Sequence, residues 1–294
     1  MSIVENLLAM AEQKRAARAA AAPPPEPPRL VAATEPAEPE VAPAKRIHID
    51  FRRLRAEGYA PEQGQERRFA DFCREIKRPL LRKALAAGAA ADRRLVMVSS
   101  ALPGEGKTFV TLSLAFSLAR ERDLSVLLVD ADLPKGHISS ALGLQHEPGL
   151  LDALADDKRN VESLIVGTDI PGLTILPAGQ PNEGATELIT SARMTQIAAA
   201  LVARNPRRLV LLDSPPLLVS IEARGLIQIP GLVLLVVRSG HTPRQALADA
   251  LAYVDNHKLH GVVLNESRVA TQGEYYGYQG YGADSEGPPD ARDK

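Results

Sequence analysis

Tryptophan is absent from the 294-residue chain, and aromatic residues make up only 4% of it. A surface that stacks single-stranded bases needs exposed aromatic rings, so this composition argues against such a surface. The formal net charge is −1, which gives no overall electrostatic attraction to nucleic acid or to anionic lipid. We therefore expect no nucleic-acid partner.

Cysteine occurs once, at Cys73, and no apolar run reaches the ~18 residues that a membrane-spanning helix needs. A single cysteine cannot form an internal disulfide and suits a reducing compartment, so we expect Cys73 to pack within a helix. The first residues lack the long apolar core and the cleavage site of a secretory signal. These absences predict a cytoplasmic protein. The six histidines show no metal-binding spacing.

A glycine-bearing turn follows a short apolar run in the stretch LVMVSSALPGEGKT, residues 95–108. Apolar residues at helical spacing come directly after it, so the order is strand, turn, helix. Gly104 and Gly106 allow backbone amides to surround an anion, and the helix that follows adds its positive N-terminus. Lys107 contributes a charge for the β and γ phosphates, and the Thr108 hydroxyl can bind magnesium. The stretch predicts a phosphate-binding loop.

This loop departs from the common G-x-x-x-x-G-K-[ST] pattern at Ala101, which stands in the place of the first glycine. A chance glycine turn before a helix is the alternative interpretation. The predicted nucleotide-binding residues of the loop are Pro103, Gly104, Glu105, Gly106, Lys107, Thr108 and Phe109.

Acidic side chains end two other apolar runs. Asp130 and Asp132 follow the run 126–129, and Asp213 follows the run 209–212. The carboxyl ends of parallel strands form the ligand-binding edge of such a sheet, and hard cations prefer oxygen ligands. We therefore predict Thr108, Asp130 and Asp213 as magnesium ligands, with Asp213 acting directly or through water. Ordinary acidic turns after strands are the alternative.

Alternating strands and helices predict an α/β fold of the P-loop NTPase type, with a mainly parallel central sheet flanked by helices. The predicted domain covers residues 91–268. Within it, 185–204 is expected to be one helix, and a helix capped by Thr242 follows the strand 232–237. A last strand at 260–267 contains Asn265.

The flanking segments have their own compositions. Residues 1–20 predict an amphipathic helix, which either docks on a partner or membrane surface or frays as a short terminal helix. Residues 21–46 predict a disordered proline-rich linker. Residues 47–90 predict an arm and a basic helix, which Pro79 should bend or end.

Residues 269–294 predict a disordered tail, in which the tyrosines cluster. These are Tyr275, Tyr276, Tyr278 and Tyr281.

The motifs SSALPGEGKT, VDAD, LLDSPP and REIKRPLL together resemble those of the bacterial tyrosine kinases, in particular the exopolysaccharide- and exosortase-associated tyrosine autokinases of the P-loop ATPase superfamily. The resemblance covers roughly residues 45–285. It implies ATP and Mg²⁺ as cofactors, and phosphorylation of the four tail tyrosines by a neighbouring subunit. It implies that Lys107, Asp130, Asp132 and Asp213 are catalytic, with Asp130 or Asp132 taking the tyrosine proton. It places Asn265 at the adenine and Arg238 on the nucleotide side.

The same resemblance implies partners. These are a membrane chain-length or co-polymerase protein, other copies of the chain in a ring, and a tyrosine phosphatase. The protein would then lie at the inner membrane through its partner. In the basic helix Phe72-Cys73-Arg74 stands where the family has Glu-aromatic-Arg for the ring contact, so only Arg74 is left to keep that role.

Two other functions remain open on the sequence alone. One is a P-loop ATPase switch of the chromosome-partitioning or division-site type, without kinase activity. Those enzymes carry a second lysine early in the loop, where this chain has Leu102. The other is an interaction module that binds nucleotide without turnover, which the substitution at Ala101 keeps open.

Overall fold

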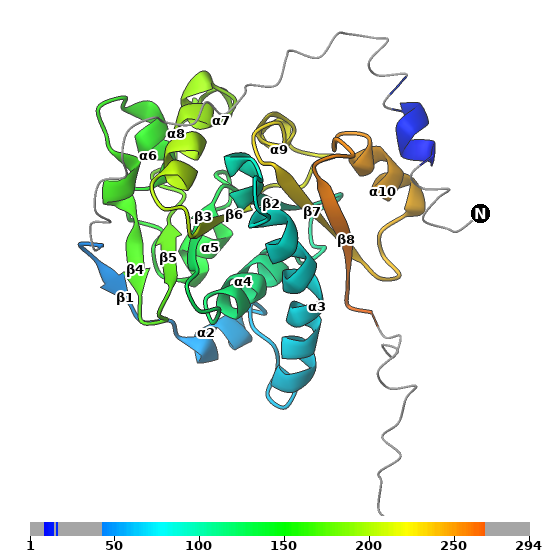
Figure 1. Ribbon diagram of the computed structural model, residues 1–294, viewed down its shortest axis with the longest axis horizontal. Helices are drawn as coiled ribbons and strands as arrows, with labels where there is room; N and C mark the ends of the chain where they lie inside the picture. Colours follow the sequence, from blue (N-terminus) through cyan, green and yellow to red (C-terminus); the bar gives the residue numbers. More distant parts are fainter. Residues whose placement is uncertain (1–8, 15, 17–42, 268–294) are drawn as a thin grey trace, which may run out of the picture.

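An eight-stranded sheet forms the centre of the computed structural model, which describes residues 9–14, 16 and 43–267. The strand order is β1-β4-β5-β3-β6-β2-β7-β8 (Figure 1). All neighbouring strands are parallel except β4 and β5. The mainly parallel sheet is therefore confirmed. The strands are β1 (Arg46–Ile47), β2 (Leu95–Ser100), β3 (Ser125–Asp130), β4 (Val166–Thr168), β5 (Leu173–Leu176), β6 (Arg208–Asp213), β7 (Leu232–Arg238) and β8 (Leu259–Asn265).

Helices cover both faces of this sheet (Figure 1). Helices α2 to α5 bury apolar side chains in a core cluster on one face, and α6 to α10 do so on the other. The α-helices are α2 (Phe51–Ala56), α3 (Glu66–Ala84), α4 (Lys107–Leu118), α5 (His137–Ala141), α6 (Leu150–Ala155), α7 (Ala185–Ile189), α8 (Ala192–Ala203), α9 (Ile221–Leu226) and α10 (Arg244–Leu251). Short 3₁₀ helices are η1 (Ala91–Arg94) and η2 (Val161–Leu164).

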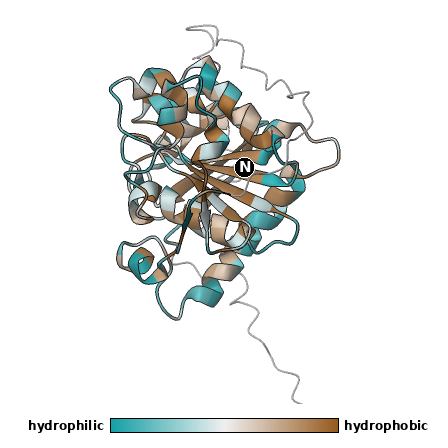
Figure 2. Cartoon of the chain, turned by 90° about the vertical axis from the view of Figure 1, so that its left-hand side faces the viewer, coloured by the Kyte–Doolittle hydropathy of each residue, from teal (hydrophilic) through white to brown (hydrophobic). Residues whose placement is uncertain are grey.

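The central strands β3 and β6 have continuous apolar interiors, Val126–Val129 and Leu209–Leu212, because both of their faces are covered. In β3, Val126 and Leu128 contribute to the cluster under α4, whereas Leu127 and Val129 contribute to the opposite one. This alternation follows from the two-residue period of a strand. Figure 2 shows the strands as a hydrophobic layer in the middle of the molecule, with hydrophilic positions on the outside.

The predicted helix 185–204 is wrong in one respect, because it divides into α7 and α8. Between them, Thr190 donates from its hydroxyl to the carbonyl of Thr186 at 2.9 Å, and Ser191 donates to that of Leu188 at 2.7 Å. Such side-chain bonds satisfy carbonyls that a continuous helix would use, and so favour a break.

The sequence led us to expect that Pro79 would bend or end the basic helix. The helix does not end there, because α3 continues through Pro79 to Ala84. Leu80 and Ala84, which follow the proline, are buried in the core cluster that α3 shares with α4. Their burial stabilises the last turn by packing, which offsets the hydrogen bond that proline cannot make. The predicted cap Thr242 is also wrong, since α10 begins at Arg244 with Pro243 as its N-cap residue.

Residues 9–14 are helical and contact α10 (Figure 1). Ala11 is buried in the same core cluster as α10, and Lys14 forms an ion pair with Asp249. Of the predicted linker 21–46, residues 43–46 are described, and Arg46 already pairs with Gly167 in the sheet. The rest of the linker and the predicted tail 269–294 lie outside the described residues. None of the helices within the described ranges is both long and apolar enough to cross a bilayer.

Candidate active site

The predicted phosphate-binding loop joins the end of β2 to the start of α4. Gly104 and Gly106 have φ angles of +77° and +84°, a left-handed conformation that glycine adopts without strain. Helix α4 begins at Lys107, and within the described part of the chain no side chain caps its first amides. Those amides and the helix dipole favour an anion at this point. The methyl group of Ala101 is buried in the core beside the loop.

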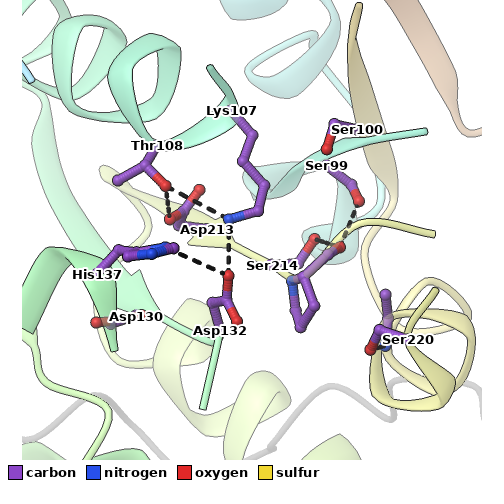
Figure 3. A network of polar contacts seen from close by, with 12 residues as sticks. Ser99, Ser100, Lys107, Thr108, Asp130, Asp132, His137, Asp213, Ser214 and Ser220 are labelled. Atoms are coloured by element: carbon purple, nitrogen blue, oxygen red, sulfur yellow. Dashed lines mark hydrogen bonds and ion pairs between the residues drawn. The ribbon is translucent and has the colours of Figure 1, made fainter. Parts of the chain in front are cut away.

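Lys107 is buried and its ammonium donates to the Asp132 carboxylate at 2.7 Å (Figure 3). Burial alone would lower the pKa of Lys107, but the carboxylates of Asp213, Asp132 and Asp130 raise it above its ordinary value. Burial works to raise the pKa of Asp132, yet His137 and Lys107 hold it below its usual value. Both partners are therefore charged at neutral pH.

Asp213, at the end of β6, accepts hydrogen bonds from the first two turns of α4. The Thr108 hydroxyl donates to its Oδ2 at 2.8 Å, and the Thr111 hydroxyl donates to its Oδ1 at 3.0 Å. Asp213 is fully buried, and this burial raises its pKa. These bonds link the acidic strand end directly to the residue predicted to bind magnesium.

Asp130 ends β3, the neighbour of β6 in the sheet. Its Oδ2 accepts from the amide and the hydroxyl of Ser139, at 2.8 and 2.7 Å. Its Oδ1 is buried without a hydrogen-bond partner among the described residues. Burial, together with the charge of Asp213, raises the pKa of Asp130 to about 7. A buried carboxylate oxygen without a hydrogen bond is available to coordinate a cation.

A second group of residues surrounds Glu105 on the other side of the loop. One carboxylate oxygen of Glu105 accepts from the amide of Leu102 at 2.7 Å, and the other accepts from the Thr242 hydroxyl. The carbonyl of Glu105 accepts from the Asn265 amide group at 3.0 Å. Arg238 forms an ion pair with Glu266 at 2.7 Å. The segment that follows β7 and the end of β8 thus contact the loop, through Thr242 and Asn265.

The structure therefore gathers Lys107, Thr108, Asp130, Asp132 and Asp213 at one edge of the sheet, as predicted, and Asn265 lies against the loop. Residues at this edge that the sequence did not reveal are the hydrogen-bonding partners Thr111 and Ser139, and His137, whose Nδ1 lies 3.7 Å from the Asp132 carboxylate. Thr111 lies one helical turn after Lys107, which is a recognisable spacing; the other two follow Asp132 in a segment without periodicity. The tail tyrosines lie outside the described residues.

Magnesium fits this donor set. Mg²⁺ is held in such sites by one or two carboxylates, a hydroxyl and the phosphate oxygens of the nucleotide. The unpaired Oδ1 of Asp130, the Thr108 hydroxyl and the Asp213 carboxylate would be the protein's ligands for such an ion. In the described ranges no group of three or more His, Cys, Asp or Glu side chains could hold a metal ion by itself.

Comparison with known proteins identifies the family. A family model described as an AAA domain matches residues 93–265, more than half of the chain. The tyrosine-protein kinase YwqD of Bacillus subtilis (strain 168) is 32% identical over 197 residues, which cover 65% of this chain and 81% of the relative. The chain belongs to the bacterial tyrosine kinase family.

Two further similarities bear on this kinase family member. The putative tyrosine-protein kinase EpsB of Ralstonia solanacearum is 34% identical over 211 residues, which cover 68% of this chain and 28% of the relative. The kinase domain of the Escherichia coli tyrosine kinase Etk superposes with a TM-score of 0.54 at 28% identity, covering 69% of this chain and 75% of that one. The chain spans about a quarter of the length of the first curated relatives. Family membership implies nucleotide binding at the P-loop.

Proposed function

We propose that this protein is an ATP-dependent tyrosine autokinase that acts with a membrane co-polymerase in exopolysaccharide production. The observation that carries the proposal is the convergence of Lys107, Thr108, Asp130 and Asp213 at the N-terminus of α4. Such an arrangement suits phosphoryl transfer, in which positioning and charge stabilisation do most of the work. The kinase names of the relatives support the same activity.

Each residue has a role that follows from its contacts. The amides of the loop and the Lys107 ammonium hold the β and γ phosphates. Thr108, Asp130 and Asp213 hold Mg²⁺, which neutralises charge that develops on the phosphate oxygens. Asp132 then remains as the carboxylate that accepts the proton of the tyrosine hydroxyl at its Oδ2, the atom that Lys107 contacts in this structure. Asn265 and Arg238 lie on the side where we place the base of the nucleotide.

The proposed phosphoacceptors are the four tail tyrosines, presented to the site by another copy of the chain. Their phosphates would add strong negative charge to an already acidic segment and so favour dissociation of a ring-like assembly. A membrane chain-length protein as activator, a tyrosine phosphatase as antagonist, and a location at the inner membrane belong to the same proposal.

Purified protein incubated with labelled ATP and Mg²⁺, followed by blotting for phosphotyrosine, tests the activity. We expect label on the wild type and loss of most label when Tyr275, Tyr276, Tyr278 and Tyr281 are all changed to Phe. Binding of ATP should be the same in both proteins. ATP hydrolysis without phosphotyrosine would instead support the partitioning-type switch, and binding without turnover would support a nucleotide-binding module.

A further inference from the structure

A cavity of about 310 Å³ lies between α2, α3 and α4, on the outer side of the helix that begins at Lys107. Aromatic rings from all three helices line it. The Phe51 ring lies 5.1 Å from the Phe116 ring, measured between centroids, and Phe69 forms another part of the wall. Pockets of roughly 300 Å³ and more, with apolar walls and a few polar groups, are the usual form of small-ligand sites.

Two buried polar groups of this cavity lack a partner among the described residues. They are the hydroxyl of Ser113, a residue that is 5% exposed, and the Nε of Arg55. A buried donor without an acceptor is unfavourable, so the structure favours a ligand that supplies one. The guanidinium can only donate, and a serine hydroxyl can donate as well. The missing group is therefore an acceptor oxygen.

The charges around the cavity favour an anionic oxygen. Arg55 and Arg120 line it, together with Glu66 as its acidic residue. Arg55 Nη2 lies 3.8 Å from the Glu66 carboxylate, too far for a hydrogen bond, so this pair leaves the guanidinium available. Cys73 contributes an apolar wall, since burial raises the pKa of its thiol to about 12.

The cavity is also connected to the active site. The Phe69 ring contacts the Phe109 ring edge-on at 5.0 Å, and Phe109 directly follows Thr108. The Cys73 sulfur lies 3.7 Å from the carbonyl of Ser113 in α4. A ligand in the cavity would therefore touch the helix whose N-terminus carries the phosphate-binding loop.

We propose that this cavity binds an aromatic ring that carries a phosphate, and that its source is a phosphotyrosine in the tail of another copy of this chain. The phenyl walls accept the ring in offset or edge-on geometry, while Arg55, Arg120 and the Ser113 hydroxyl bind the phosphate oxygens. This inference rests on the proposed autokinase function, because that activity supplies phosphotyrosine. Binding of this phosphotyrosine would couple the phosphorylation of one copy to the phosphate-binding loop of the copy whose cavity it occupies.

Fluorescence anisotropy tests the proposal with a labelled synthetic peptide of residues 270–284 phosphorylated at Tyr278. The protein is the full chain with its four tail tyrosines changed to Phe, so that its own tail cannot compete. We expect the phosphopeptide to bind at least about tenfold more tightly than the same peptide without phosphate, since bonds to charged groups are strong. Phenyl phosphate should displace it, and inorganic phosphate, which suits the P-loop, should not.

Substitutions of the residues that line the cavity test whether the phosphopeptide binds there. Arg55→Gln and Ser113→Ala should each weaken phosphopeptide binding about tenfold, and Ala70→Trp, which fills the rim of the cavity, should abolish it. Arg52→Gln, an exposed arginine of the same helix outside the cavity, is the matched control and should bind normally. Thermal unfolding and ATP binding show whether each variant is folded.

Displacement by inorganic phosphate, or unchanged binding in the folded Arg55→Gln and Ala70→Trp variants, would overturn the assignment. If phenyl phosphate binds and the phosphopeptide does not, the cavity binds a free small molecule. The proposal that its ligand is a phosphotyrosine of the tail would then be overturned. Because the peptide is synthetic, these results do not depend on kinase activity. A kinase-negative protein that binds the phosphopeptide would refute the proposed function alone.

Discussion

Asn265 donates a hydrogen bond from its side-chain amide to the backbone carbonyl of Glu105, at 3.0 Å, across 160 residues of chain. This contact joins the end of the edge strand β8 to the phosphate-binding loop. It also leaves no room at the next residue, because a Cβ on Gly106 would lie 2.1 Å from that same amide nitrogen. The loop conformation and the position of Asn265 therefore depend on each other.

The substitution Gly106→Ala is expected to abolish ATP binding and to destabilise the protein. It places a side chain at a φ of +84°, which costs about 1–2 kcal/mol, and it also displaces Asn265. Urea unfolding and equilibrium ATP binding measure the two effects.

Gly104→Ala is the matched control for the unfolding measurement. Its φ is +77°, but nothing lies within 4 Å of the added methyl group, so only the backbone cost should appear. The double variant Gly106→Ala/Asn265→Ala should recover part of the stability lost by Gly106→Ala alone. Equal destabilisation of both glycine variants, with no recovery in the double variant, would show that the Asn265 contact is unimportant.

Replacement of Lys107 by Met should reduce autophosphorylation by a factor of about 10²–10³ or more, because one charge-stabilising donor is lost from a buried site. The initial rate of phosphotyrosine formation measures this effect. Lys135→Met provides the control, since Lys135 is exposed on the turn before α5. A Lys107→Met protein that labels its tyrosines as fast as the wild type would refute the site.

Asp132→Asn separates binding from chemistry. In the present structure the Asp132 carboxylate neutralises Lys107, and it would repel a bound triphosphate. Its loss should therefore leave ATP binding unchanged or tighter, while kcat falls about 10²–10⁴-fold because the proton acceptor is gone. ATP titration and single-turnover phosphorylation measure the two parts. A weaker ATP affinity with an unchanged kcat would assign Asp132 to binding alone.

Periodicity and motif context were enough to predict the sheet and its functional edge. The apolar runs that end at Asp130 and Asp213 are the neighbouring strands β3 and β6. They were predictable because a strand that is covered on both faces has a continuous apolar sequence. The break between α7 and α8 was missed, since the side-chain bonds of Thr190 and Ser191 compete locally with a helical pattern that continues on both sides.

Other parts of the structure depend on contacts that no local pattern contains. The short strand β4 pairs with β1, which lies over a hundred residues earlier in the chain, and was not predicted. Ser139 binds Asp130 only because α5 turns back over the end of β3. The cavity beside α4 requires three helices to meet around Ser113, so spacing along one helix could not reveal it.

Asp130 should make the stability of the nucleotide-free protein depend on pH. Burial and the charge of Asp213 raise its pKa from an ordinary value of 3.8 to about 7 in the folded state. Between those values the folded state holds a proton that the unfolded state has lost, so the free energy of unfolding falls as the pH rises and levels off above pH 7. At about 1.4 kcal/mol for each pKa unit, the whole fall amounts to roughly 4 kcal/mol.

Asp130→Asn removes this titration, because an amide stays neutral and its oxygen can still accept from Ser139. The variant should therefore be more stable than the wild type at pH 8, and the difference should shrink toward pH 5. Urea unfolding of both proteins in EDTA at several pH values between these limits measures it. Asp213 is buried in both proteins, and the substitution also removes the charge that Asp130 places beside it. Two unfolding curves that stay parallel across this range would mean that Asp130 is ionised in the folded protein, and that a cation is not needed to hold its charge.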